Sequence, residues 1–253
     1  MEDVLTVKDL SIKIKDRILI QNVSFNIKQG DAVLLSGPNG VGKSSLLKAI
    51  LRLETDGKEI QGDIIVHKFG NVLELNSSEL QNYRSSVAYV QQKDEYSQMG
   101  NVQVRDIINE SDEPHSGKTL SAAEVNSLID KWIPRNSSDK RIFDAKSKPA
   151  KFSGGEQRLL SVLSVMATRS NAELFIIDEP LNNLDFVNAR NISNLINTVI
   201  KKNPNAALLM ISHCRVFPFI NRELRLTSEG IREVTDRYVC HSCFGEHDSE
   251  GFY

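Results

Sequence analysis

The chain lacks any apolar stretch that approaches the roughly 20 residues a membrane-spanning helix needs. Its first residues, MED, do not form the charged and then apolar pattern of a secretory signal. The three cysteines, Cys214, Cys240 and Cys243, are too few and too unevenly placed for a disulfide framework, which fits a reducing compartment. We therefore expect a cytoplasmic protein, unless a partner holds it at a membrane.

An excess of positive charge is also missing. The 31 Lys and Arg residues against 33 Asp and Glu residues give a formal net charge of -2. Without a net positive field to gather phosphate backbones, a dedicated nucleic-acid binder is not expected. The 253 residues contain no internal repeat and suit one large α/β core with an inserted subdomain.

A glycine-rich loop is the most informative feature that is present. It follows the apolar residues 32–35 and reads GPNGVGKSS. Its glycines let backbone N–H groups approach a β-phosphate, while Lys43 is placed to reach the β- and γ-phosphates and Ser44 to bind Mg²⁺. The helix that follows directs its positive end at the anion. The loop therefore predicts a nucleoside triphosphate site formed by Gly37, Pro38, Asn39, Gly40, Val41, Gly42, Lys43, Ser44 and Ser45.

A second Mg²⁺ ligand and a water-activating group are predicted near residue 178. Residues 174–177, LFII, have the continuous apolar character of a strand buried on both faces of a parallel sheet, and Asp178, Glu179 and Pro180 follow. Ligands gather at such carboxyl ends. Asp178 would hold Mg²⁺ through water and Glu179 would act as general base. An ordinary solvated turn is the alternative interpretation.

Residues 152–158, FSGGEQR, lie between these two motifs. Here the chain resembles the ATP-binding cassette (ABC) proteins, whose signature LSGGQ appears as FSGGE. A Ser at a helix start followed by two glycines also suits anion binding, although it equally describes the N-cap of an ordinary amphipathic helix. In the family, the signature of one copy closes over the ATP of another, so the resemblance implies that Ser153, Gly154 and Gly155 complete the partner's site.

Three further segments resemble motifs of the family, and all the motifs occur along the chain in the family's order. Residues 87–92, VAYVQQ, resemble the strand and Gln-loop, which implies that Gln92 joins Mg²⁺ and the attacking water, with Gln91 as the alternative register. Residues 181–185, LNNLD, resemble the D-loop of the dimer interface. His213, after the apolar residues 208–211, matches the switch histidine at the γ-phosphate.

The expected fold is α/β, with a P-loop NTPase core, an N-terminal antiparallel β lobe and an inserted α-helical subdomain. The nucleotide-binding core would span about 1–92 and 156–235, the helical subdomain with the signature 93–155, and a tail 236–253. The local patterns predict strands at 4–15, 22–28, 60–66, 87–92, 174–177 and 208–211, helices at 44–53, 102–109 and 121–132, polar segments at 77–84 and 110–118, and edge strands at 223–226 and 231–234.

The chain departs from the family pattern at a few positions. An aliphatic residue, Ile14, falls where the family stacks an aromatic on adenine, so the preference for ATP rests on the resemblance. Glu156 and Asn183 replace the usual Gln and Ala near the interface and are expected to tune dimer closure. The tail residues 238–247 contain two Cys, two His and one Glu, but they lack the second ligand pair of an ordinary zinc site, so a disordered or partner-binding tail is favoured over a metal site.

The motifs together predict an ATPase subunit of an ABC transporter. It would bind ATP and Mg²⁺, pair with itself or a paralogous subunit, and act on a membrane-embedded partner at the cytoplasmic face. The alternative is a soluble cassette that remodels a non-membrane partner, as in iron–sulfur cluster assembly. A nucleotide-binding protein without turnover is disfavoured by Glu179 and His213.

Overall fold

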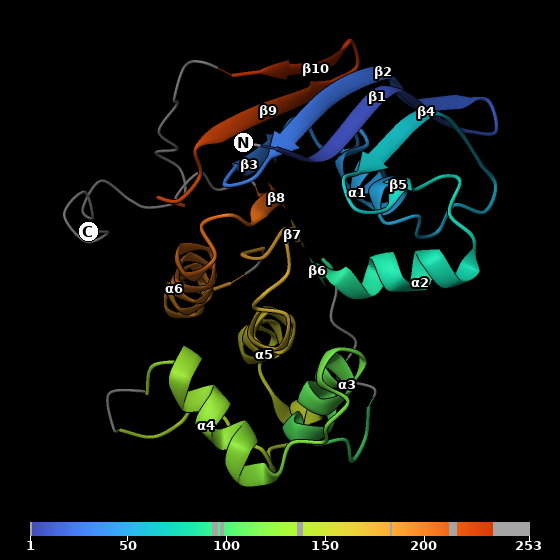
Figure 1. The fold of residues 1–253 in the computed structure, drawn as a ribbon. Helices are drawn as coiled ribbons and strands as arrows, with labels where there is room; N and C mark the ends of the chain where they lie inside the picture. Colours follow the sequence, from blue (N-terminus) through green and yellow to red (C-terminus); the bar gives the residue numbers. More distant parts are fainter. Residues whose placement is uncertain are drawn as a thin grey trace, which may run out of the picture.

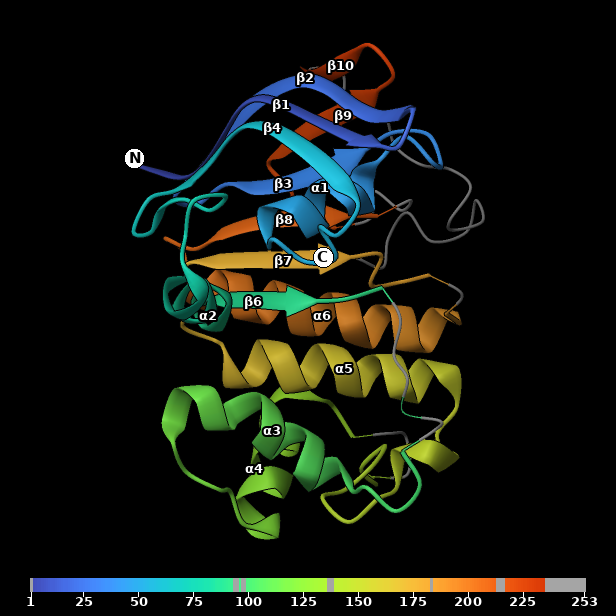
Figure 2. The ribbon, with the colours of Figure 1, turned by 90° about the vertical axis from the view of Figure 1, so that its right-hand side faces the viewer.

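The computed structural model describes residues 2–92, 96, 99–135, 139–182, 184–212 and 217–234. An antiparallel lobe, a mostly parallel sheet and a set of helices lie one below another (Figures 1 and 2). In chain order the elements are β1 (Asp3–Ile14), β2 (Arg17–Lys28), β3 (Ala32–Ser36), α1 (Lys43–Ile50), β4 (Lys58–Val66), β5 (Gly70–Asn71), α2 (Ser77–Ser86), β6 (Val87–Val90), α3 (Val104–Ser116), α4 (Ala122–Trp132), the 3₁₀ turn Pro149–Lys151, α5 (Gly154–Thr168), β7 (Leu174–Asp178), α6 (Phe186–Lys202), β8 (Ala207–Ile211), β9 (Arg222–Thr227) and β10 (Gly230–Glu233).

The larger sheet has the strand order β10-β9-β3-β8-β7-β6. All its neighbouring pairs are parallel except β10 and β9. Every residue of β7 and β8 is buried, as their apolar sequences predict. Because β3, β6 and β7 run the same way, the P-loop, Gln92 and Glu179 all leave the sheet at one edge.

The prediction of an edge strand at 223–226 is wrong. These residues belong to β9, which pairs with β3 on one side and β10 on the other, so that β10 and not β9 is the edge strand on this side of the sheet. The parallel partner is far away in sequence, and a short alternating pattern carries no information about it.

The smaller sheet, of order β2-β1-β4-β5, is antiparallel and forms the predicted β lobe. Helix α1 packs between this lobe and the larger sheet (Figure 2). Leu46, Leu47 and Ile50 of α1 are fully buried in the same apolar cluster as Leu10 of β1 and Ile176 of β7. The lobe and the larger sheet therefore share one core around the helix that follows the P-loop.

Helices α3 to α6 lie below the larger sheet in Figure 2 and share a second apolar cluster with its other face. Helix α4 begins as predicted, with Ser121 as N-cap and Glu124 completing a capping box. Within the described residues no helix is both long and apolar enough to cross a membrane.

The structure places helices in both predicted polar segments, and the prediction that residues 110–118 separate two helices is wrong. Residues 77–84 lie in helix α2, which buries only Tyr83 and is started by a capping box between Asn76 and Glu79. Residues 110–116, expected to separate two helices, continue α3 to Ser116. The helix ends just before Gly117, whose φ of 62° is the left-handed backbone conformation that is common in the residue after an α-helix. In both cases a polar sequence was not predicted to be helical because it lacks an apolar stripe at helical spacing.

The junction between α4 and α6 contains the only tryptophan of the chain. Trp132 ends α4 and is 9% exposed. The Nζ of Lys202, at the end of α6, lies 4.5 Å from the centre of a ring of Trp132, and the Nζ of Lys131 lies 5.1 Å from it. Ammonium groups at such distances are attracted by the indole face, so this contact stabilises the packing of α4 beside α6.

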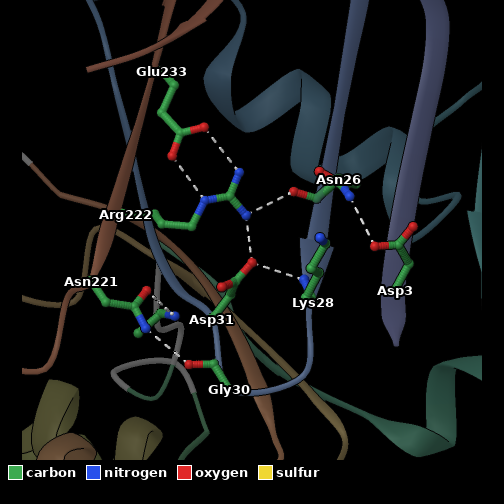
Figure 3. Close-up of polar contacts among 9 residues, drawn as sticks. Asp3, Asn26, Lys28, Gly30, Asp31, Asn221, Arg222 and Glu233 are labelled. Carbon is green, nitrogen blue, oxygen red and sulfur yellow. Dashed lines mark hydrogen bonds and ion pairs between the residues drawn. The ribbon is translucent and has the colours of Figure 1, made fainter. Parts of the chain in front are cut away.

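A polar network joins the two sheets (Figure 3). Arg222 of β9 donates to both carboxylate oxygens of Glu233 on β10, at 3.0 and 3.2 Å, and to the backbone oxygen of Asn26 on β2 at 3.1 Å. Its guanidinium also pairs with Asp31, which precedes β3. Because one planar guanidinium of β9 contacts β10, β2 and the residue before β3, it links the β lobe to the larger sheet.

Candidate nucleotide-binding and catalytic site

The P-loop has the backbone geometry that its glycines predict. Gly37 has a φ of 140°, and a Cβ there would lie 2.2 Å from the backbone oxygen of Leu226. Gly42 has a φ of 105° and is the N-cap of α1. No side-chain capping hydrogen bond is present at this helix start among the described residues. The first turn of α1 also contains no acidic residue. The amides at this helix start are therefore left to an anion.

Lys43 is folded back over the loop. Its Nζ donates hydrogen bonds to the backbone oxygens of Gly37, at 2.8 Å, and Pro38, at 2.9 Å, and the residue is only 7% exposed. Burial lowers the pKa of the Lys43 ammonium, and the carboxylates of Glu179 and Asp178 oppose that shift. A buried ammonium beside a bare helix start concentrates positive charge where phosphates would bind.

Asp178 ends β7 and is 2% exposed. Its Oδ1 atom is buried and has no hydrogen-bond partner among the residues that the structure describes. Burial raises the pKa of the Asp178 carboxyl, and a hydrogen bond from Ser44 acts in the opposite direction. An orphaned buried carboxylate oxygen beside a hydroxyl suits a hard divalent cation, so the residues present fit Mg²⁺.

Glu179 follows directly and has a φ of 48°, which is uncommon outside glycine. Its backbone N–H donates to the oxygen of Ile211 on β8 at 2.9 Å. Its Oε2 accepts hydrogen bonds from Nε2 of Gln92, at 2.9 Å, and from Nδ2 of Asn182, at 3.0 Å. The carboxylate is thus held by the segments that follow β6 and β7.

A cleft of about 620 Å³ brings together eight of the predicted site residues, whereas Gly37, Pro38, Val41 and Asp178 are not among the described residues that line it. Among the predicted set, those lining it are Asn39, Gly40, Gly42, Lys43, Ser44, Ser45, Gln92 and Glu179. Three residues that the sequence interpretation gave no role in the site, Arg17, Leu19 and Asn182, line it as well. Ile14, where a base-stacking aromatic was sought, pairs with Arg17 in the β1–β2 hairpin and is not among the described lining residues.

The signature residues form a separate helix start. Ser153 is the N-cap of α5, its Oγ accepting from the N–H of Glu156 at 3.3 Å while its own N–H donates to the Glu156 carboxylate at 2.8 Å. Gly154 has open space around it, whereas a Cβ on Gly155 would lie 2.3 Å from Nδ2 of Asn188. Ser153, Gly154 and Gly155 are not among the described residues that line the P-loop cleft.

Arg158 is a structural residue of the site that the sequence interpretation missed. It is 5% exposed and donates to the backbone oxygens of Asp178, at 2.9 Å, of Glu179 and Pro180, both at 3.2 Å, and of Gln91. One guanidinium of α5 therefore fixes both the Gln-loop and the loop after β7. The sequence gives one indication of this role, which is that Arg158 directly precedes the buried apolar residues Leu159 and Leu160 of α5.

These contacts also distinguish the two glutamines of the Gln-loop. The backbone oxygen of Gln91 is bound to Arg158, whereas the side-chain amide of Gln92 reaches Glu179 in the cleft. His213, Asn183 and the Cys- and His-containing tail lie outside the described residues.

A sequence profile of the ABC transporter family matches residues 20–182, more than half of the chain. The chain belongs to the ABC transporter family. It is an ATP-binding cassette that hydrolyses ATP to energise transport.

Relatives and solved structures agree with that assignment. The zinc import ATP-binding protein ZnuC of Rickettsia conorii is 28% identical over 83% of this chain and 76% of its own length. The phosphate import ATP-binding protein PstB of Saccharolobus solfataricus is 27% identical over 84% of this chain and 79% of its own. The fold matches that of the dimeric cassette MJ0796, solved in a post-hydrolysis state bound to ADP and Pi, with a TM-score of 0.69, 21% identity, and coverage of 92% and 99% of the two chains.

Proposed function

We propose that the cleft at the carboxyl edge of the larger sheet is where this cassette binds and hydrolyses ATP. The P-loop amides and Lys43 hold the β- and γ-phosphates, and the positive end of α1 adds to their attraction. Glu179 accepts a proton from the water that attacks the γ-phosphorus, and the bond to the ADP oxygen breaks. His213, which follows β8, contacts the γ-phosphate.

Mg²⁺ supplies charge neutralisation at the phosphates when it is bound. Ser44 and Gln92 would hold it, and Asp178 would hold it through water. The support is the orphaned oxygen of Asp178 beside the Ser44 hydroxyl, and the position of Gln92 in the same cleft. Because the Nε2 atom of Gln92 already donates to Glu179, its Oε1 atom can serve the cation without releasing the base.

We also propose that two cassettes complete each other's sites. Ser153, Gly154 and Gly155 start a helix apart from the P-loop cleft and would close over the ATP of a second copy or a paralogous ABC subunit. Higher affinity of the closed pair for ATP than for ADP would then drive a partner's conformational cycle.

The partner in this proposal is a membrane-embedded transporter subunit, with the cassette on the cytoplasmic face and no nucleic acid involved. The relatives named for zinc and phosphate import support a transport role. Residues 93–155 would carry the docking subdomain, residues 1–92 and 156–235 the nucleotide-binding core, and residues 236–253 a tail.

Lys43 and Glu179 line one cleft, and the carboxylates of Glu179 and Asp178 both act on the Lys43 ammonium. This arrangement carries the proposal, and Glu179→Gln tests it. The substitution keeps the shape but removes the base, so turnover should fall by at least about a hundredfold while ATP-dependent dimerisation becomes stronger. Hydrolysis and gel filtration with MgATP measure the two effects, with Glu229→Gln, on an exposed turn, as the matched control. Turnover at the wild-type rate in Glu179→Gln would reject Glu179 as the base.

A further inference from the structure

A second amide holds Glu179, and it belongs to the D-loop. Asn182 Nδ2 lies 3.0 Å from Oε2 of Glu179, and Gln92 Nε2 lies 2.9 Å from the same oxygen. Asn182 is exposed and lines the P-loop cleft together with Glu179. It therefore lies where the hydrolytic water would approach, although its side chain plays no part in packing the core.

The two donors differ in what anchors them. Gln92 follows β6, and its amide is shared between Glu179 and the proposed cation site. Asn182 lies only three residues after Glu179 in the same loop, and its backbone N–H faces the oxygen of Glu179 at 3.4 Å. Its hold on the carboxylate is thus local and does not depend on how Gln92 turns towards a nucleotide.

Glu179 needs such a restraint because of its own chain. Its side chain has three rotatable bonds, and the backbone conformation, with a φ of 48°, is fixed by the N–H bond to Ile211 and by Arg158 at the carbonyl. Backbone anchoring does not orient the carboxylate. Hydrogen bonds from two amides to one charged oxygen do so, and bonds to charged groups are stronger than those between neutral ones.

We infer that Asn182 is a positioning residue that orients Glu179 for hydrolysis through its amide N–H. The inference rests on the proposed role of Glu179 as base. It assigns to the D-loop side chain a contact within its own subunit, separate from any contact across a dimer interface. Loss of this bond lowers the rate of hydrolysis and leaves ATP affinity near its wild-type value, because Asn182 holds the base and not the phosphates.

Two substitutions separate orientation from packing. Asn182→Asp keeps the shape but replaces the donor with a negative charge about 3 Å from Oε2 of Glu179, whereas Asn182→Leu removes the donor and keeps the size. A role through the amide N–H predicts that Asn182→Asp is the more damaging. A role in loop packing predicts the reverse order, because Asp is the closer match in shape.

The experiment is single-turnover hydrolysis of radiolabelled ATP with the full chain in excess, alongside equilibrium ATP binding and thermal unfolding. We expect Asn182→Leu to lower the hydrolysis rate about tenfold and Asn182→Asp to lower it further, with ATP affinity changed less than about twofold. Asn194→Leu, on an exposed position of α6, is the control and should behave as wild type. A wild-type rate in Asn182→Leu, or a milder effect of Asn182→Asp, overturns the inference.

Glu179→Gln measured in the same assay separates this inference from the proposed function. If Glu179→Gln is inactive and Asn182→Leu is normal, only the role of Asn182 fails. If Glu179→Gln hydrolyses ATP at the wild-type rate, the base assignment fails and the role of Asn182 fails with it.

Discussion

The starts of α1 and α5, both predicted to meet phosphate, differ in how their amides are used. At α1 the N-cap is Gly42, with no side-chain cap in the described structure and no acidic residue in the first turn. At α5 the N-cap is Ser153, whose Oγ and N–H are both engaged by Glu156. The first helix start is bare, and the second carries its own anion.

This difference in capping matches the two binding roles proposed for the starts of α1 and α5. A bare start relies on its ligand to satisfy the amides, which suits a loop that is open to the cleft and braced by the buried Lys43. A capped start is stable by itself, which suits a surface that meets its ligand only when a second subunit arrives. The cap also places a negative charge where a phosphate would approach. The pairing of cassettes is therefore expected to be weaker than it would be with a neutral residue at position 156.

The largest effect is expected from removing the ammonium group of Lys43 at the start of α1. Lys43→Ala deletes a buried ammonium that holds two loop carbonyls and would bind two phosphates, so ATP affinity should fall by at least about a hundredfold. Equilibrium binding of a fluorescent ATP analogue measures it. Lys201→Ala, at an exposed position near the end of α6, is the control for a lost positive charge. Unchanged affinity in Lys43→Ala would contradict the P-loop assignment.

An intermediate effect is expected from acidification, again at the α1 site only. Burial raises the pKa of Asp178, so this carboxylate takes up a proton at a higher pH than an ordinary aspartate. Because Mg²⁺ needs the ionised form, Mg²⁺-dependent ATP affinity should weaken as the pH falls through the raised pKa, by up to about tenfold per pH unit below it.

ATP titrations from neutral pH down to the lowest pH at which the protein stays folded, with Mg²⁺ or with EDTA, test this dependence. Asp178→Asn should bind ATP weakly with Mg²⁺ at every pH and lose the part of the pH dependence that belongs to Asp178. If wild type and Asp178→Asn show the same profile, Asp178 does not hold the cation.

The smallest effect is expected from neutralising the capped start. Glu156→Gln keeps a side chain that can complete the capping box but removes its charge, so ATP-dependent dimerisation should strengthen by about two- to fivefold. Sedimentation in a Glu179→Gln background with saturating ATP measures the dimer affinity.

The matched control is Glu124→Gln, which alters the equivalent capping box on α4. It should leave dimerisation unchanged, and both variants should keep the thermal stability of the parent. Weaker dimerisation in Glu156→Gln would show that the carboxylate helps closure and would remove the distinction between the two helix starts.

Features of the site that depend on neighbouring residues were predictable from sequence. The glycine spacing of the P-loop and the apolar run before Asp178 are local patterns, and each has a direct structural cause in backbone approach or strand burial. The same holds for the helix predicted at 121–132, which the structure shows as α4.

Features that depend on distant partners were not predictable. The residues next to Arg158 in sequence do not indicate that its guanidinium binds the carbonyls of Gln91 and Asp178, because those contacts form only when α5 packs on the sheet. The hydrogen bond from Asn182 to Glu179 requires the unusual backbone of Glu179, which the sequence does not encode by a glycine. Helix α2 was not predicted for a different reason: it buries only Tyr83, so it shows no apolar stripe at helical spacing, although a capping box between Asn76 and Glu79 starts it.

The contact between Trp132 and Lys202 has an optical consequence. The chain contains one tryptophan, so its indole emission reports from one place, the junction of α4 and α6. An ammonium beside the ring makes that emission sensitive to the distance between the two helices. The protein thus carries an intrinsic fluorophore at the contact between α4 and α6. Spectroscopy can follow a rearrangement of this contact during a catalytic cycle without any added label.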